Sequence, residues 1–133
     1  MQIKIYVDGA YSSSRNQGGW AFVVLQDGIK IHSAFFPEKN TTNNRMEIQA
    51  AIEAIIWSKG NNLLTIEIFS DSMYVVGTMT LNWKRKLNVD LWEQLDKIIE
   101  GMDITWTHVK GHSGDKYNEL CDALAVIASQ TND

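Results

Sequence analysis

IKIYVDGAYSSSRNQGGWAFVVLQDGIKIHSAFF, residues 3–36, contains three strand patterns in succession. Residues 3–7 alternate apolar and mixed side chains with the period of two that is typical of a strand, and Asp8-Gly9 stops the pattern. A polar loop is expected over 10–19, ending in two glycines. The chain therefore begins with a strand that leads into a turn.

Two further strands are predicted over 20–26 and 29–36. The dipeptide Asp27-Gly28 between them is a strong hairpin signal, and Pro37 is expected to end the meander. Because consecutive strands with short links pair with their neighbours, these three strands should be antiparallel.

From residue 44 onward the hydrophobic period changes to that of a helix. The remaining expected elements are a helix over 44–60, a strand over 63–69, a short helix over 72–76 that breaks at Gly77, a helix capped by Asp90, a strand over 104–108 and a helix over 116–128. Strands joined through helices should be parallel. The predicted fold class is α/β, with a mixed five-stranded sheet flanked by helices, as a single domain over 1–133.

The 133 residues carry 12 Lys and Arg against 16 Asp and Glu, a net charge of −4. This is the wrong sign for a simple nucleic-acid binder, unless the acidic residues are clustered on metal ions. The single cysteine, Cys121, excludes an internal disulfide and favours a reducing compartment. No apolar run approaches the length of a membrane span, and the strand pattern begins at once after Met1. We therefore expect a cytoplasmic protein that begins without a preceding domain.

Four acidic residues are candidates for a metal site: Asp8, Glu47, Asp71 and Asp122. Each has a structural alternative. Asp8 fits a turn, Glu47 fits a capping box with Asn44, Asp71 fits a helix cap, and Asp122 fits an exposed helix face. Taken together, two strand ends and two flanking helices could bring these carboxylates into one pocket for hard divalent cations.

Five segments in order closely resemble the signature segments of type 1 ribonuclease H. They are Tyr6-Val7-Asp8-Gly9, Thr42-Asn43-Asn44-Arg45-Met46-Glu47, Phe69-Ser70-Asp71-Ser72, Trp106-Thr107-His108-Val109-Lys110-Gly111-His112 and Asn118-Glu119-Leu120-Cys121-Asp122. The resemblance runs over residues 3–128 and implies the same mixed-sheet fold.

The resemblance implies an endonuclease that hydrolyses the RNA strand of an RNA–DNA hybrid with two Mg²⁺ ions, for which Mn²⁺ can substitute. Asp8, Glu47, Asp71 and Asp122 match the family's metal-binding carboxylates, with Asp8 bridging both ions. One ion would activate water and the other would stabilise the leaving 3′ oxygen, giving 5′-phosphate and 3′-hydroxyl ends. His112 matches a loop histidine that handles a proton and assists product departure; its alternative is an ordinary solvated histidine.

The resemblance also implies substrate contacts. Asn43 and Asn44 match readers of the minor groove, and Glu47 and Asn43 would hydrogen-bond the RNA 2′-hydroxyl. Thr42 with Asn16 matches a phosphate pocket, and Asn118 lies one helical turn before Asp122 and would orient the site. The loop after Asp8 departs from the common bacterial form, which affects the alignment of Asn16.

A second departure concerns the basic residues. The lysine-rich protrusion of many family members is absent, and Trp83-Lys84-Arg85-Lys86 leads through Leu87 directly to Asn88. Trp83 resembles an aromatic that packs against DNA sugars, although a core position is the common fate of tryptophan. We expect Lys84, Arg85 and Lys86 to contact phosphates, with weak binding and a shallow salt dependence; the alternative is a solvated face.

Three alternatives remain from the sequence. A non-catalytic hybrid-binding module would keep the fold without turnover, and a junction resolvase or integrase core would share the sheet and acidic site. A purely structural domain is the third. The chain is expected to be a monomer, either a free enzyme or a domain of a reverse transcriptase.

Overall fold

The computed structural model describes residues 1–111 and 114–131. Within these residues the elements follow the predicted order β-β-β-α-β-α-α-β-α. Their bounds are β1 (Ile3–Ser12), β2 (Gln17–Gln26), β3 (Ile29–Lys39), α1 (Asn43–Gly60), β4 (Thr65–Ser70), α2 (Met73–Thr80), α3 (Val89–Ile98), β5 (Asp103–His108) and α4 (Lys116–Gln130).

The five strands form one mixed sheet in the order β3-β2-β1-β4-β5. β1 pairs antiparallel with β2, and β2 pairs antiparallel with β3. β4 lies parallel to β1 on its other side, and β5 continues parallel to β4. The predicted fold class is confirmed.

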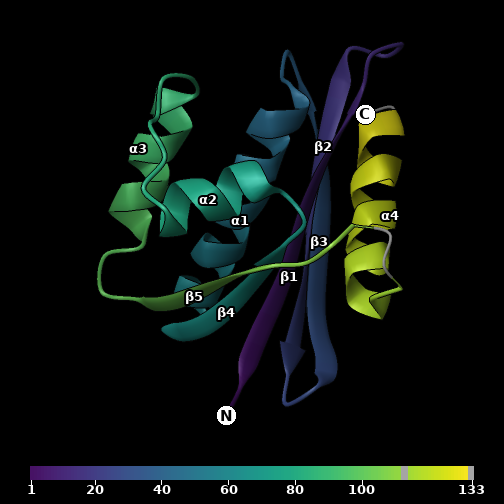
Figure 1. Ribbon diagram of the computed structural model, residues 1–133. Helices are drawn as coiled ribbons and strands as arrows, with labels where there is room; N and C mark the ends of the chain where they lie inside the picture. The colour runs from purple at the N-terminus through teal and green to yellow at the C-terminus, as the bar shows by residue number, and fades with distance from the viewer. Residues whose placement is uncertain (112–113, 132–133) are drawn as a thin grey trace.

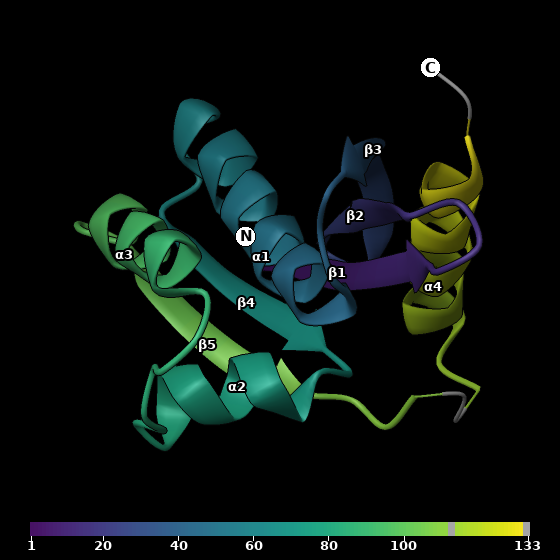
Figure 2. The same cartoon turned by 90° about the horizontal axis from the view of Figure 1, so that it is seen from above.

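Helices cover both faces of the sheet. Figures 1 and 2 show α4 on one side and α1, α2 and α3 on the other. The larger core lies under α1, where Ile5, Ile52 and Trp92 are almost completely buried. The smaller core lies under α4 and includes Tyr6, Val23 and Cys121. β1 is therefore covered on both faces, as a central strand should be.

The predicted polar loop over 10–19 is wrong at both ends. β1 continues past Asp8 to Ser12, and β2 already begins at Gln17. The two strands form a long hairpin in which Ser12 pairs with Gln17. Glycine is needed at Gly19 because a Cβ there would lie 2.5 Å from the Ala125 carbonyl oxygen of α4. β2 begins with two adjacent glycines because α4 lies close to Gly19 on one face and Met46 of α1 lies close to Gly18 on the other.

Two predicted breaks are also wrong. Pro37 lies inside β3 opposite Gly19, which is tolerated because β3 is an edge strand and one side of it carries no ladder. α2 continues through Gly77, where the ring of Trp83 occupies the space that a Cβ would fill. The absence of a side chain at Gly77 therefore lets Trp83 pack closely against α2.

Across residues 1–111 and 114–131, the helices are all too short or too polar to cross a membrane.

Candidate active site

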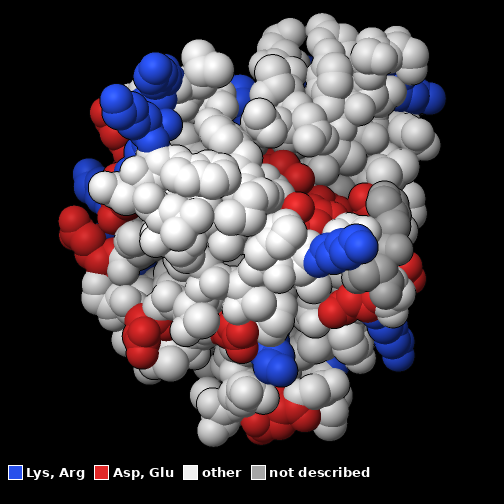
Figure 3. Space-filling model, in the orientation of Figure 1, with Lys and Arg blue, Asp and Glu red and all other residues white. Residues whose placement is uncertain are grey.

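Four elements bring the predicted carboxylates to one edge of the sheet. Asp8 lies within β1, and Asp71 comes directly after the end of β4, the parallel neighbour of β1. Glu47 lies in the second turn of α1, and Asp122 lies midway along α4. Asp8, Glu47 and Asp71 each offer an oxygen, and these oxygens lie within 4.8 Å of one another. In Figure 3, red carboxylates line a recess in the middle of the face shown.

Gly9 makes this arrangement of β1 and α1 possible. Its backbone N–H donates to Glu47 Oε1 at 2.6 Å and to Asp8 Oδ1 at 2.9 Å. A Cβ at Gly9 would lie 2.4 Å from the backbone nitrogen of Glu47, so any larger residue would push α1 away from β1. The sequence indicated only a turn at Gly9, and this contact with α1 was not predicted.

The capping-box interpretation of Glu47 is wrong. Thr42 is the N-cap of α1, and its hydroxyl accepts a hydrogen bond from the backbone N–H of Arg45. Glu47 is therefore beyond the first turn, and its carboxylate faces Gly9 of β1. The capping roles suggested for Asp71 and Asp90 are likewise taken by neighbours, Ser72 for α2 and Asn88 for α3. Asp71 is thus free of a capping function at the edge of the cluster.

Burial and mutual repulsion raise the pKa values of the central carboxyl groups. Asp8 is only 2% exposed and Glu47 is 7% exposed. Burial is the main cause of the raised pKa of Asp8, and the charges of Glu47 and Asp71 add to it. Burial likewise raises the pKa of Glu47, with further contributions from Asp71 and Asp122. Carboxylates held this way gain stability when cations neutralise them.

Unsatisfied buried oxygens provide an independent sign that cation ligands lie in this part of the fold. Asp8 Oδ2 and Asn118 Oδ1 are both buried without a hydrogen-bond donor among the described residues. Such oxygens cost free energy unless something pairs with them. Carboxylate and amide oxygens are the ligands that Mg²⁺ and similar hard cations accept. The donor set at this edge therefore fits a divalent cation.

Asp122 approaches the cluster from α4, on the opposite face of the sheet from α1, and Asn118 lies on the same helix. Both lie on α4, one helical turn apart, and Asn118 is 2% exposed whereas Asp122 is half-buried. Asp122 is not part of the tightest group of three oxygens. It nevertheless lies close enough to Asp8 to add to the raised pKa of that carboxyl, whose main cause is burial. Asp122 is therefore a neighbour of the three grouped carboxylates and more accessible than Asp8 or Glu47.

The predicted proton-handling residue, His112, lies outside the described residues. Its predecessor Gly111 lies beside the cluster, since a Cβ there would be 3.4 Å from Asp71 Oδ2. The backbone N–H of Val109 donates to the Ser70 carbonyl at 2.9 Å, which ties the end of β5 to the end of β4. Gly111, the last described residue before His112, therefore lies beside the carboxylates.

The predicted substrate contacts occupy different places. Asn16 lies in the β1–β2 turn in the left-handed region, and its side-chain oxygen accepts from the Tyr11 hydroxyl at 2.7 Å. Thr42 and Asn43 are at the start of α1, and Asn44 lines a groove with Lys84 and Lys86. The expected pairing of Asn16 with Thr42 remains a prediction.

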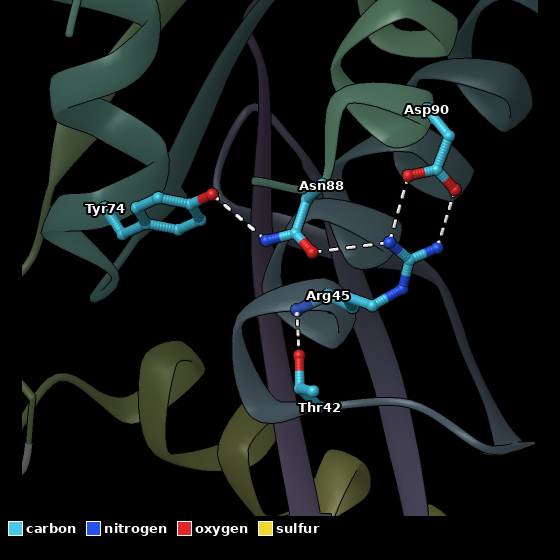
Figure 4. Close-up of polar contacts among 5 residues, drawn as sticks. All are labelled: Thr42, Arg45, Tyr74, Asn88 and Asp90. Carbon is cyan, nitrogen blue, oxygen red and sulfur yellow. Dashed lines mark hydrogen bonds and ion pairs between the residues drawn. The ribbon is translucent and has the colours of Figure 1, made fainter. Parts of the chain in front are cut away.

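A polar network connects the start of α1 to the starts of α2 and α3 (Figure 4). The guanidinium of Arg45 donates to both carboxylate oxygens of Asp90, at 3.0 and 2.7 Å, and to Asn88 Oδ1 at 3.3 Å. Asn88 Nδ2 in turn donates to the Tyr74 hydroxyl at 3.1 Å. The contacts of Asn88 and Tyr74 were not predicted from the sequence. Asn88 adopts a left-handed backbone (φ 58°), which asparagine favours, so its residue type was the one local signal.

A mixed sheet with a carboxylate cluster where the parallel pairing of β1 and β4 ends is typical of a class of α/β enzymes whose acidic residues can bind metal ions. Comparison with known proteins narrows the class. The family model described as RNase H matches residues 1–130. The chain therefore belongs to the ribonuclease H family.

Curated relatives agree over nearly the whole chain. The ribonuclease H of Caldanaerobacter subterraneus subsp. tengcongensis is 39% identical over 138 residues, covering 93% of this chain and 88% of the relative. The ribonuclease H of Acetivibrio thermocellus is 36% identical over 145 residues, covering 98% and 97%. The family assignment thus rests on both the signature segments and the rest of the sequence.

Solved structures share the fold. The RNase H1 of the archaeon Halobacterium salinarum superposes with a TM-score of 0.84 at 26% identity, covering 98% of each chain. LC11-RNase H1, solved in complex with an RNA/DNA hybrid, superposes with a TM-score of 0.78 at 22% identity, covering 96% of this chain and 99% of that one. At this identity the second likeness supports the fold alone.

Proposed function

We propose that this protein is an endonuclease that hydrolyses the RNA strand of RNA–DNA hybrids with two divalent metal ions, giving 5′-phosphate and 3′-hydroxyl ends. The observation that carries the proposal is the buried cluster of Asp8, Glu47 and Asp71, with an unpaired oxygen on Asp8. Membership of the ribonuclease H family and the curated relatives named ribonuclease H support both the reaction and the hybrid substrate.

Asp8, Glu47, Asp71 and Asp122 would hold the metal ions, with Mg²⁺ as the expected ion and Mn²⁺ as a substitute. Bound divalent ions supply Lewis-acid stabilisation of a phosphodiester and lower the pKa of a coordinated water. The Gly9 N–H fixes the carboxylates of Asp8 and Glu47 in relation to one another. This prior fixation means that the ligand geometry need not be assembled during the reaction.

The chain's other residues would bind substrate and move a proton. We infer that His112 exchanges a proton with the reacting phosphate, because the preceding glycine lies beside Asp71. Asn43 and Asn44, at the start of α1, are placed to contact the hybrid next to the carboxylates, since Glu47 is one turn further along the same helix. A 2′-hydroxyl hydrogen bond to Glu47 or Asn43 would explain the requirement for RNA.

The decisive experiment compares end-labelled RNA–DNA, DNA–DNA and RNA–RNA duplexes of one sequence, with and without Mg²⁺. We expect cleavage of the RNA strand in the hybrid alone, dependent on the metal, with 5′-phosphate on the downstream product. Cleavage of the DNA duplex would favour a resolvase-like or integrase-like nuclease. Binding of the hybrid without cleavage at any metal concentration would favour the non-catalytic module.

A further inference from the structure

β3 forms one edge of the sheet, and no strand of residues 1–111 or 114–131 lies on its outer side. Figure 2 shows it as the outermost strand, on the side of the sheet away from β5. Edge strands expose backbone N–H and C=O groups that can pair with a further strand. Phe35 is 44% exposed and Phe36 is 52% exposed. Two adjacent aromatic side chains on an open edge indicate a contact surface.

Pro37 shows which backbone groups of β3 point outward. It lies opposite Gly19 of β2, and a proline nitrogen has no hydrogen to donate to that strand. Its nitrogen therefore faces away from the sheet. Backbone groups alternate in direction along an antiparallel strand, so the N–H and C=O groups of Phe35 and Ser33 also point outward. β3 thus offers an open ladder edge from Ser33 to Pro37.

A β-bulge limits how far this edge can pair. The register of β3 shifts at Ile31, which is an extra residue opposite the junction of Val24 and Leu25. A bulge bends its strand and interrupts the ladder. The regular part of the edge therefore runs from His32 to the end of β3 at Lys39.

The side chains of this regular part are complementary to a second copy that runs in the opposite direction. Phe35 would then lie opposite its own counterpart. Ala34 would lie opposite Phe36, which sets a small side chain against a large one. His32 would lie opposite Glu38, which sets a ring N–H against a carboxylate. Cross-strand pairs of these kinds stabilise a sheet.

Contacts within the protein agree with this pairing, because residues opposite one another must share a face of the sheet. His32 stacks on Trp57 of α1, with ring centroids 4.7 Å apart. The indole of Trp20, which belongs to the core under α1, donates to Glu38 Oε1 at 3.4 Å. His32 and Glu38 therefore both lie on the α1 face. Phe35 lies on the α4 face, since strand side chains alternate.

We propose that β3 pairs antiparallel with β3 of a second copy about a two-fold axis at Phe35, forming one continuous sheet across both chains. The two Phe35 residues exchange N–H···O bonds, and the Ser33 N–H of each copy donates to the Pro37 carbonyl of the other. Such a contact is isologous and closes as a dimer. It departs from the monomer expected from the sequence, and it does not depend on the proposed function.

The contact is small, so the dimer is weak. A phenylalanine side chain has about 200 Å² of surface, so the half-exposed rings of Phe35 and Phe36 on both chains offer about 400 Å² for burial. Interfaces below about 1,200 Å² belong to transient complexes, so a dissociation constant on the order of 10–100 μM is expected. Because β2 separates β3 from β1, the dimer leaves both carboxylate edges uncovered.

Sedimentation velocity of the full chain at about 1–500 μM, which brackets that dissociation constant, tests the association. The wild type should shift from 15.1 kDa toward twice that mass. Phe35→Lys should stay monomeric, because it places like charges opposite one another at the axis. Ser33→Pro should also stay monomeric, because it removes an outward N–H and leaves the ladder with β2 in place.

Ile56→Lys is the matched control. Ile56 lies on α1 and is 46% exposed, close to the exposed fraction of Phe35, so the same substitution there should leave dimerisation as in the wild type. Thermal melting shows that each variant is folded.

Cysteine cross-linking tests the register. The Cα atoms of a hydrogen-bonded antiparallel pair lie about 5.5 Å apart, a separation that a disulfide can span. Phe35→Cys should therefore give a disulfide-linked dimer under diamide. Phe36→Cys should do so at least about tenfold more slowly, because its counterpart is displaced along the strand by about 7 Å. The wild type controls for Cys121, which is buried.

The proposal is overturned if the wild type stays monomeric throughout, if a folded Phe35→Lys or Ser33→Pro variant dimerises as the wild type does, or if Ile56→Lys abolishes the dimer. Assemblies larger than a dimer also overturn it, because they indicate pairing of β3 with β5 of the next copy, which does not close. Faster cross-linking at position 36 than at 35 overturns the axis at Phe35. Cleavage enters none of these measurements, so the proposed function is tested separately.

Discussion

The carboxylate cluster and the segment between α2 and α3, residues 81–88, are both expected to contact the same substrate. The two regions are built in opposite ways. Asp8 and Glu47 are buried, lie on a central strand and its covering helix, and are held by a backbone N–H. Lys84 and Lys86 are exposed and project from a stretch without regular structure that is anchored by Trp83 and Arg85.

The difference reflects the two tasks. Metal ligands must be held to a fraction of an ångström, and their repulsion is tolerable only because the surrounding fold is rigid. Phosphate contacts contribute through net charge and tolerate movement, so a loop can supply them. Changes in the cluster should therefore alter rate with large effects, and changes in the segment should alter affinity with smaller ones.

The largest effect is expected for Asp8→Asn. Loss of a metal-binding charge should remove Lewis-acid stabilisation of about 4 kcal/mol, which lowers the cleavage rate by about 10³-fold. The rate is measured on saturating hybrid with Mg²⁺, and circular dichroism checks that the variant remains folded. A rate near that of the wild type, or an unfolded variant, would remove Asp8 from the proposed metal site.

The same variant should gain stability in the metal-free protein, although it loses activity. In the metal-free protein the pKa values of Asp8 and Glu47 are raised by burial and by neighbouring charges, so the folded state binds more protons than the unfolded state above about pH 4. Stability should then fall as the pH rises from about 5 to about 8. Asp8→Asn should make the stability less dependent on pH, and Mg²⁺ should have the same effect on the wild type. Melting temperatures measured across this pH range test both expectations.

The second effect is expected for His112→Ala. A group that transfers a proton contributes about 10²–10⁴-fold, and the metal ligands remain intact, so the rate should drop by about 10²-fold without disappearing. The measurement is the rate at saturating substrate from pH 6 to 9. Equal rates for the variant and the wild type across that range would make His112 an ordinary loop histidine.

The third effect concerns stability and uses one glycine from each region. Gly9→Ala would drive a methyl group into the backbone of α1 at Glu47, which cannot yield, so the free energy of unfolding should fall by about 3 kcal/mol. Gly77→Ala meets only the ring of Trp83, which is 43% exposed and can move aside. The higher helix propensity of alanine, about 1 kcal/mol, should offset that displacement.

Urea denaturation of both glycine variants, with cleavage assays alongside, tests this contrast. Gly9→Ala should also lose activity, because Glu47 moves with α1, whereas Gly77→Ala should retain it. Equal destabilisation of the two variants would show that the cluster is no more rigidly built than the segment.

Much of the fold could be predicted from the sequence because hydrophobic periodicity identifies elements directly. The element order and the mixed sheet were confirmed, and the tight grouping of Asp8, Glu47 and Asp71 agrees with the metal site expected from the family resemblance. The roles of these residues and of the substrate contacts stay predictions. The wrong details share one physical origin, which is what lies, or does not lie, beside each segment in the folded protein.

Gly9, Pro37 and Gly77 illustrate that origin. Each is a breaker by local rules, yet Gly9 lies inside a strand because α1 crosses there, and Gly77 lies inside a helix because Trp83 packs on it. Pro37 can lie within β3 because β3 is an edge strand, with a neighbouring strand on one side only. Tertiary packing decided each case, and no local pattern contains that information.

The smallest effect is expected for Asp90→Ala. Asp90 lies in the first turn of α3 and accepts two hydrogen bonds from Arg45, which hold the pKa of Asp90 down to about 2 (Figure 4). A lowered pKa means that the pair stabilises the fold above the unfolded value of about 4 and loses its contribution as the pH falls toward 2. Because the Asp90 carboxylate is exposed, solvent and salt screen the pair.

Asp90→Ala should therefore lower the melting temperature only slightly at pH 7 and low salt, and 1 M NaCl should remove most of the difference. The effect on hybrid binding should be larger than this stability change implies. Arg45 also donates to Asn88, which anchors the end of the lysine-bearing segment, so freeing Arg45 loosens the groove without touching it. A double-mutant cycle of Asp90→Ala with Lys84→Gln/Lys86→Gln measures this coupling, with hybrid binding followed by fluorescence anisotropy. Non-additive binding losses are expected, since loosening the loop should reduce the affinity less once Lys84 and Lys86 have been replaced. Strict additivity would mean that the network at the start of α1 and the groove act independently.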